Sequence, residues 1–226
     1  MNELGLTKQL NNDYVVFGGT FDPVHLGHLN SAQELAQVMG YQRLILMPCG
    51  DAYHKGGNTS SAKHRLFMLN LAVQEINKSS AGTILQVDDR ETRRQGATYT
   101  VDTLQALRDE LGPNAHLVWV MGTDAAQGLH QWHNWQRMFE LANIIVVARN
   151  GEVFHPTHVW PAPHVEDISE FKGQSHGVYH TVCLTPVDIS SSDIRLAIQS
   201  SKSVENHVPQ TILNYVEQHG LYQGNN

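Results

Sequence analysis

Cysteine and excess positive charge are both scarce in this sequence. Its 226 residues include two cysteines, Cys49 and Cys183, and neither belongs to a C-x-x-C or other metal-type pattern. This usage argues against a disulfide framework and favours a reducing compartment, where each cysteine is expected to be a small buried side chain. The formal net charge of −7 leaves no basic excess to neutralise a nucleic acid backbone. A nucleic acid polymer is therefore not expected as a partner, although a local pocket for a small anion is still allowed.

Long apolar runs are also missing. No window approaches the roughly 18 apolar residues of a membrane-spanning helix, and the start, MNELGLTKQLNND, has neither a basic nor an apolar signal region. The sequence thus predicts a soluble, cytoplasmic protein without a membrane partner. Its length suits one core rather than two, so residues 1–226 are expected to form a single domain with residues 1–12 as an N-terminal extension. The oligomeric state cannot be read from the sequence.

Short apolar runs alternate along the chain with segments of helical periodicity. The runs are apolar throughout, which is typical of strands buried on both faces of a sheet. They cover residues 14–18, 43–48, 83–88, 116–122, 143–149 and 178–184, and helices are expected at about 26–39, 61–77, 100–111 and 134–141. This β-α-β-α order predicts a single-domain, Rossmann-like α/β/α sandwich with a mainly parallel sheet. In such sheets, ligands bind beyond the carboxyl ends of the strands, where the strand order reverses.

Two segments in the last third of the chain have a different composition. Residues 150–177 contain three prolines, three glycines and four histidines without a clear period. This composition predicts a long surface loop, with solvated histidines rather than a metal site. Residues 189–222 are expected to form a C-terminal helical part, in which Pro209 suits a first helical turn and Gly220 a C-terminal cap.

The most informative string is GGTFDPVHLGH, from Gly18 to His28. The missing Cβ atoms of Gly18 and Gly19 would let a ligand approach the backbone closely. The string is not the G-x-G-x-x-G of dinucleotide-binding folds, and it lacks the lysine of a P-loop. His25 and His28 stand at i and i+3, so in a first helical turn both would lie on one face, beside backbone N–H groups that favour an anion. Read alone, the pair also suits one capping and one core histidine.

A second anion-binding pattern is ISSSDIR, from Ile189 to Arg195. Its serines suit the capping of a helix whose N-terminus faces an anion. Arg195 is expected in the first turn, and its planar, permanently charged fork matches phosphate oxygens. An ordinary capped surface helix is the alternative.

Together, the two patterns resemble the signature of the H-x-G-H nucleotidyltransferases, and the T-F-D-P-V-H form is similar to the bacterial nicotinate-mononucleotide adenylyltransferases. The resemblance implies that the catalytic residues are His25, His28 and Arg195. It also implies a set of ATP-binding residues: Gly18, Gly19, Thr20, Phe21, Gly122, Asp124, Arg149, Ser191 and Ser192. The implied reaction joins ATP and nicotinate mononucleotide to give deamido-NAD and pyrophosphate.

Three further blocks extend this resemblance: ETRRQGATYTVDTL, VMGTDAAQGLHQWHNW and the C-terminal VPQTILNYVEQHGLY. The first has Thr98 where the family usually has serine, and the second contains a tryptophan that contacts the pyridine ring in the family. The implied mononucleotide-binding residues are His54, Lys55, Thr98, Tyr99, Thr100 and Trp132. From the residues alone, Trp132 and Trp135 also suit core positions, Asp124 suits a helix cap, and Tyr99 suits a strand.

One departure from the family concerns the loop after the second strand. DAYHKGG has Ala52 and Tyr53 where the family usually has two prolines, but it keeps His54 and Lys55. Because prolines restrict the unliganded backbone, their loss predicts a more mobile loop before substrate binds.

The implied chemistry requires no protein base. The nucleophile is a phosphate oxygen that is already largely ionised, since its second pKa is about 6. Catalysis then consists of alignment and electrostatic stabilisation, and Mg²⁺ would be held mainly by ATP phosphates and water, so no protein ligand to the metal is assigned. The alternatives are a related enzyme using nicotinamide mononucleotide or phosphopantetheine, or a catalytically inactive nucleotide-binding regulator.

Overall fold

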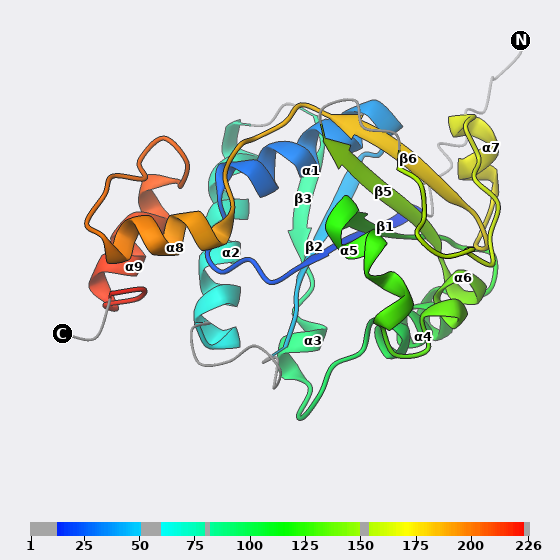
Figure 1. Ribbon diagram of the computed structural model, residues 1–226, viewed down its shortest axis with the longest axis horizontal. Helices are drawn as coiled ribbons and strands as arrows, with labels where there is room; N and C mark the ends of the chain where they lie inside the picture. Colours follow the sequence, from blue (N-terminus) through cyan, green and yellow to red (C-terminus); the bar gives the residue numbers. More distant parts are fainter. Residues whose placement is uncertain (1–12, 51–59, 80–81, 150–153, 224–226) are drawn as a thin grey trace, which may run out of the picture.

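A single parallel sheet forms the centre of the protein. The computed structural model describes residues 13–50, 60–79, 82–149 and 154–223 (Figure 1). Its strands are β1 (Asp13–Gly19), β2 (Arg43–Pro48), β3 (Ile84–Val87), β4 (His116–Gly122), β5 (Asn143–Arg149) and β6 (Tyr179–Leu184). They lie in the order β3-β2-β1-β4-β5-β6, and every neighbouring pair is parallel. The order reverses between β1 and β4, which marks the crevice where this architecture binds ligands.

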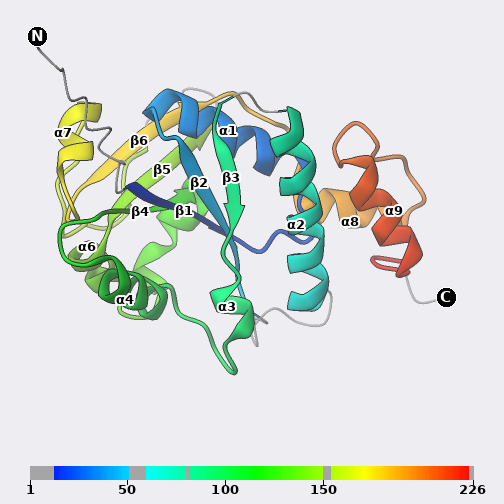
Figure 2. The ribbon, with the colours of Figure 1, turned by 180° about the vertical axis from the view of Figure 1, so that it is seen from behind.

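The helices connect these strands in the predicted alternation. They are α1 (Leu26–Met39), α2 (Ala62–Ser79), α3 (Arg90–Arg93), α4 (Thr100–Leu111), α5 (Thr123–Gln127), α6 (Met138–Leu141), α7 (Ile168–Gly173), α8 (Ser191–Gln199) and α9 (Gln210–Gln218). The predicted helix 134–141 is divided into a 3₁₀ turn, η2 (Trp135–Arg137), and the short α6, after another 3₁₀ turn, η1 (Leu129–Gln131). Figures 1 and 2 show α8 and α9 beside α2 at one end of the molecule and α7 at the other.

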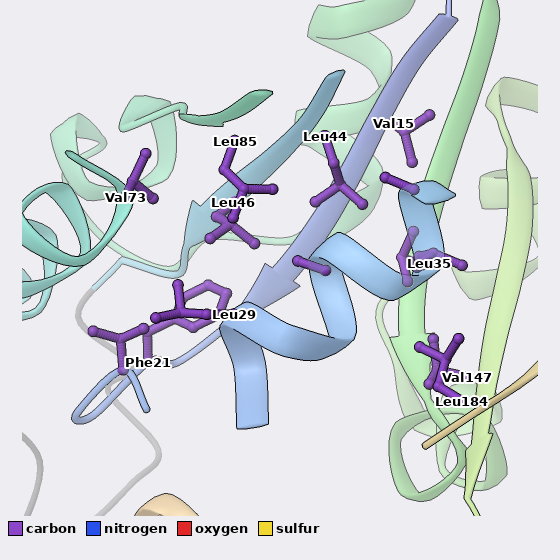
Figure 3. Packing of buried hydrophobic residues seen from close by; sticks show 14 of the residues in the cluster. Val15, Phe21, Leu29, Leu35, Leu44, Leu46, Val73, Leu85, Val147 and Leu184 are labelled. Atoms are coloured by element: carbon purple, nitrogen blue, oxygen red, sulfur yellow. The ribbon is translucent and has the colours of Figure 1, made fainter. Parts of the chain in front are cut away.

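Helices cover both faces of the sheet and form two cores. Because successive strand residues point to opposite faces, Val15 belongs to one core and its neighbour Val16 to the other. The first core packs strand residues such as Leu46 against α1, α2, α7, α8 and α9, and the second packs the opposite face against α4, α5 and α6. Figure 3 shows part of the first core, with Leu46 of β2 near Leu29 of α1. The predicted three-layer sandwich is therefore confirmed.

The segment expected to be a long surface loop is largely part of the fold. Within residues 154–177, Phe154, Trp160 and Phe171 are buried, and Phe171 belongs to α7. The Trp160 ring lies 5.2 Å from the ring of Phe139 between centroids and 4.8 Å from that of Tyr179. Phe154 and Trp160 lie in segments without regular structure, as expected of a loop, whereas Phe171 lies in a helix. The burial of all three was not predicted, because isolated aromatic residues between prolines leave no periodic pattern to read.

Two expectations drawn from what the sequence lacks can be compared with the structure. Cys183 is exposed and Cys49 is partly exposed, so the expectation of two buried cysteines was wrong. Among the described residues, no helix combines the length and apolar character needed to cross a bilayer. The cytoplasmic location stays a prediction, and residues 1–12 lie outside the described part of the chain.

Candidate active site

The two glycines that end β1 face aromatic rings. A Cβ atom on Gly18 would overlap the ring of Trp119, and one on Gly19 would lie 2.9 Å from the ring of Phe21. Phe21 is buried at a left-handed φ of 52°, a conformation that costs a non-glycine residue on the order of 1–3 kcal/mol. Its ring meets the imidazole of His28 edge-on, with centroids 4.9 Å apart. The protein's own packing therefore requires both glycines, whereas the approach of a ligand to them stays a prediction.

His25 and His28 open α1 and lie together, as their spacing predicts. His25 is the N-cap residue and His28 the third residue of the helix, and their ring centroids are 3.8 Å apart. The N–H of His25 lies 3.4 Å from Nδ1 of His28. A Cβ atom on Gly27 would lie 2.9 Å from the His25 ring, so the glycine of the H-x-G-H motif makes room for the first histidine. The two imidazoles therefore form one face at the helix start.

The start of α1 is also partly closed by the C-terminal part of the chain. The backbone N–H of Leu26 donates to the carbonyl of His207 at 2.9 Å. The backbone N–H of Leu26, one of the helix-end donors expected to favour an anion, is therefore hydrogen-bonded within the fold.

The start of α8 packs against the H-x-G-H string. Ser190 caps the helix, and the Ser191 hydroxyl donates to the carbonyl of Pro23 at 3.0 Å. Arg195 is the fifth helical residue, one position beyond the predicted first turn. Its Nη1 donates to the carbonyl of Asp22 at 2.6 Å, and its Nη2 donates to the Ser192 hydroxyl at 3.1 Å. These contacts bring the two anion-binding patterns to the same place.

A pocket of about 160 Å³ lies between the two patterns. It is bounded by the carboxyl-end residues of β1, β4, β5 and β6, so it occupies the crevice where the strand order reverses. Its lining consists of Phe17, His25, Gly27, His28, Ser31, Gly122, Val147, Ala148, Leu184, Thr185, Pro186, Val187, Ile189, Ser190 and Ser191. Ser31 and Thr185 were not predicted as site residues, although Ser31 stands three residues after His28 and so on the same helical face.

Several other residues predicted to be catalytic or to bind ATP are not among those that line this pocket: Gly18, Gly19, Thr20, Phe21, Asp124, Ser192 and Arg195. Asp124 is the exposed second residue of α5, and Gly122 is the N-cap, so Asp124 does not cap the helix. Arg149 ends β5, where its backbone pairs with Leu184. The position of its side chain is outside the described part of the structure.

One buried arginine joins the loops that lead into the site. Arg65 of α2 is 2% exposed, and its guanidinium donates to the carbonyls of Thr20 and Gly50 at 2.9 Å each. Its Nε donates to the carbonyl of Ser60 at 3.1 Å. Arg65 therefore links the ends of β1 and β2 with the start of the α2 segment. No local pattern predicts this role, because an arginine on an amphipathic helix usually faces solvent.

Two of the described residues predicted to bind the mononucleotide have contacts beyond their own segment: Thr98 lies beside Gly50, and Tyr99 lies beside His133. A Cβ atom on Gly50 would lie 2.9 Å from the side chain of Thr98, and the Tyr99 ring lies 4.4 Å from that of His133 between centroids. Tyr99 is the N-cap of α4, which begins at Thr100, and is not part of a strand. The structure thus brings the Thr98–Thr100 block next to the block that contains Trp132.

Trp132 and Trp135 are both partly buried and pack against the second core. Each therefore has a structural role, and each keeps part of its surface exposed. His54 and Lys55, together with Ala52 and Tyr53, lie outside the described residues.

Glu91 supports the same region from below the surface. It is 6% exposed and accepts a hydrogen bond from the Thr103 hydroxyl at 2.8 Å, while Arg94 donates to the Thr103 oxygen at 2.9 Å. Burial raises the pKa of Glu91, and the bond from Thr103 and the charge of Arg94 partly offset that effect. This network fixes the segment that leads to Thr98.

The described residues contain no group of three or more histidine, cysteine, aspartate or glutamate side chains suited to hold a metal ion.

A comparison of the sequence with family models decides its family. The model described as cytidylyltransferase-like matches residues 16–197, which is most of the chain. The chain belongs to the cytidylyltransferase-like family. The matched range contains both the H-x-G-H string and the S-S-S-D-I-R segment.

Curated relatives within this family have a more specific name. A protein of Yersinia pestis named "Probable nicotinate-nucleotide adenylyltransferase" is 35% identical, and the alignment covers 93% of this chain and 96% of the relative. A protein of Hahella chejuensis with the same name is 38% identical, with 95% and 97% covered. The resemblance to the nicotinate-mononucleotide adenylyltransferases read from the sequence is confirmed.

Solved structures agree with the fold of this family. The Plasmodium falciparum nicotinic acid mononucleotide adenylyltransferase complexed with NaAD superposes with a TM-score of 0.70, covering 93% of this chain and 97% of the other at 18% identity. The same enzyme complexed with APC gives a TM-score of 0.66. At this identity the comparison supports the architecture, while the roles of individual residues stay predictions.

Proposed function

We propose that this protein transfers the adenylyl group of ATP to nicotinate mononucleotide, producing deamido-NAD and pyrophosphate for NAD biosynthesis. Its full-length match to relatives named for this reaction supports the proposal. The observation that carries it is structural: the H-x-G-H string and the start of α8 meet around one pocket at the crevice between β1 and β4. Two anion-binding patterns on one pocket suit a triphosphate.

In this reaction, a phosphate oxygen of the mononucleotide attacks the α-phosphorus of ATP. The bond from that phosphorus to the oxygen that bridges the α- and β-phosphates breaks, and pyrophosphate leaves with that oxygen. The nucleophile arrives ionised, so no side chain removes a proton. His25 and His28 offer imidazole N–H groups to the phosphate oxygens, and the remaining N–H groups of Arg195 offer a planar fork. Their effect is to align two highly charged reactants and to stabilise the charge that moves onto pyrophosphate.

Mg²⁺ is proposed as the ion that accompanies ATP. The described side chains that line the pocket offer imidazole and hydroxyl groups and no carboxylate. This donor set fits an ion held by phosphate oxygens and water, and we assign it no protein ligand. When bound, the ion would neutralise part of the triphosphate charge.

The mononucleotide is proposed to bind beside the Thr98–Thr100 block. Backbone N–H groups around Thr98–Thr100 would receive the nicotinate carboxylate at the start of α4, and the exposed part of Trp132 would stack on the pyridine ring. His54 and Lys55 are proposed to reach its phosphate. A nicotinamide ring would require an acceptor as well as donors at the same place.

The test is a direct comparison of acceptors. The purified protein is given ATP and Mg²⁺ with nicotinate mononucleotide, nicotinamide mononucleotide or phosphopantetheine, and pyrophosphate release and the dinucleotide product are measured. The highest kcat/KM is expected with nicotinate mononucleotide. A preference for either other acceptor would replace the proposed substrate, and ATP binding without pyrophosphate release from any acceptor would identify a nucleotide-binding regulator.

A further inference from the structure

The carboxylate of Asp22 gathers contacts from distant parts of the chain. Asp22 is 1% exposed, and both carboxylate oxygens lie 3.2 Å from the backbone N–H donor of Ser60. The hydroxyl of Tyr222 donates to Oδ1 at 2.6 Å. The backbone carbonyl of Asp22 accepts a hydrogen bond from Arg195. A single buried residue thus connects the C-terminal end of the described chain with the arginine assigned to the triphosphate.

Arg195 does not form a close ion pair with this carboxylate. Its Nη1 lies 3.8 Å from Oδ2 of Asp22, whereas charge-assisted pairs of this kind usually close to about 2.7–2.9 Å. The guanidinium instead uses the Asp22 carbonyl and the Ser192 hydroxyl, which together occupy two of its five N–H groups. The arrangement leaves donors on Arg195 for a phosphate.

Tyr222 provides a reason for this separation. Its short hydrogen bond satisfies the buried carboxylate of Asp22. Without that bond, the carboxylate would need a close ion pair with Arg195 to offset its burial. Burial, followed by the bond to Asp22, raises the pKa of Tyr222 well above its ordinary value, so the hydroxyl stays a donor. The residue is held at a left-handed φ of 63° while its side chain packs against the first core. Its position is therefore set by the fold.

We propose that Tyr222 is a positioning residue for adenylyl transfer: its hydroxyl satisfies the Asp22 carboxylate, so that Arg195 keeps its guanidinium for the triphosphate. Without the hydroxyl, the guanidinium closes on Asp22 and the triphosphate loses a ligand. The inference rests on the proposed function for its ATP site, but it is independent of the acceptor.

The first test is Tyr222→Phe, which keeps the ring and removes the hydroxyl. ATP affinity is expected to fall about tenfold, measured as KM in turnover and as Kd by calorimetry with ATP and Mg²⁺ alone. The fall in kcat is expected to be smaller. The matched control is Tyr215→Phe on α9, whose hydroxyl bonds to Nδ1 of His64 at 2.9 Å and does not contact Asp22. The control is expected to bind ATP like the wild type.

Two combined variants distinguish positioning from a merely structural role. In Asp22→Asn/Tyr222→Phe, no buried charge remains to attract the guanidinium, so ATP affinity is expected to return toward the wild-type value. In an Arg195→Lys background, Tyr222→Phe is expected to cause little further loss of ATP affinity, because the lost group acts through Arg195. If Tyr222 had only a structural role, Tyr222→Phe would lower thermal stability. It would then also lower ATP affinity by the same factor in the wild-type and Arg195→Lys backgrounds.

The outcomes separate this inference from the proposed function. A folded Tyr222→Phe protein with wild-type ATP affinity would overturn the inference. If Tyr222→Phe does not fold, the double variant without the buried charge decides, since an ATP affinity as low as that of Arg195→Lys would contradict the proposal. A wild-type protein that binds ATP but transfers nothing to a mononucleotide would refute the proposed function. The calorimetric ATP Kd values of the wild type and Tyr222→Phe would still test the role of Tyr222.

Discussion

The two edges of the sheet carry histidines in opposite circumstances. At the carboxyl edge, where the strands end, His25 and His28 face each other and line a pocket. At the amino edge, where the strands begin, His116 is 7% exposed and lies among polar partners of the protein itself. Its Nε2 is 3.0 Å from the Tyr41 hydroxyl, and its Nδ1 is 2.6 Å from the carbonyl of Gln174. The residue type is the same, but the surroundings differ.

This difference shows how context assigns a role to a histidine. At the amino edge, both ring nitrogens have partners fixed by the fold, and burial lowers the pKa of His116, so the ring is held in its neutral form. At the carboxyl edge, the imidazoles stand at a helix start beside an open pocket. The first arrangement satisfies the ring within the fold, whereas the second places both imidazoles beside a pocket, as the proposed function requires.

The largest effect is expected from His28→Ala at the carboxyl edge. Loss of a donor aimed at developing charge should lower kcat about 10²- to 10³-fold, with little change in thermal stability. Steady-state pyrophosphate release measures the loss, and His176→Ala, which removes an exposed histidine, is the matched control. A kcat within threefold of the wild type would remove His28 from the catalytic group.

A substitution at the amino edge is expected to change the stability of the protein rather than its activity. Asn143 is fully buried, accepts the N–H of Val178 at 3.2 Å and donates to the carbonyl of Gln174 at 2.8 Å. Asn143→Ala leaves both groups without this partner and is expected to lower the free energy of unfolding by about 2–4 kcal/mol. Urea denaturation measures the change, and Asn70→Ala on the surface of α2 should cost less than about 0.5 kcal/mol.

The activity of folded Asn143→Ala completes that comparison. Its kcat/KM is expected to equal the wild-type value at a temperature where both proteins are folded. A selective loss of activity without loss of stability would mean that the two edges are not separate in function.

A smaller effect should separate two neighbouring tryptophans. Trp132→Ala is expected to weaken nicotinate mononucleotide binding by about 1–3 kcal/mol, by analogy with base–aromatic stacking. Trp135→Ala should lower stability and leave that affinity unchanged, although both rings pack against the second core. Isothermal titration with the mononucleotide tests both, and equal losses of affinity would assign the two rings the same role.

The smallest expected effect is the pH dependence of the amino edge. Because the folded pKa of His116 is below its unfolded value, its contribution to stability is complete above about pH 6.5 and declines as the pH falls from there toward the folded pKa. Wild type and His116→Gln are compared by urea denaturation at about pH 7.5 and about pH 5. The wild type should lose more free energy of unfolding, and parallel losses would contradict the neutral-ring assignment.

The regular elements could be predicted because each has its own pattern. The helices at 26–39 and 100–111 and the strands at 43–48, 116–122 and 143–149 agree with the structure, since apolar runs and helical periods are local signals. The helix at 134–141 was predicted too simply, because a left-handed Asn134 at φ 48° and a short 3₁₀ turn interrupt the period.

The parts of the site that could not be predicted depend on contacts between distant segments. Nothing local to Arg65 indicates that it joins three loops, and nothing local to Gly18 indicates that a Trp119 ring lies against it. The two anion-binding patterns were found because each is a compact string with a known chemistry. The lining residue Thr185 follows the last strand without such a signal.

The contact between Leu26 and His207 makes the start of α1 depend on a segment far along the chain. The start of the first helix is completed by a carbonyl from near the end of the chain, and the pocket needs residues from β1 through α8. The pocket is therefore complete only when β6 and the start of α8 have packed against the first helix.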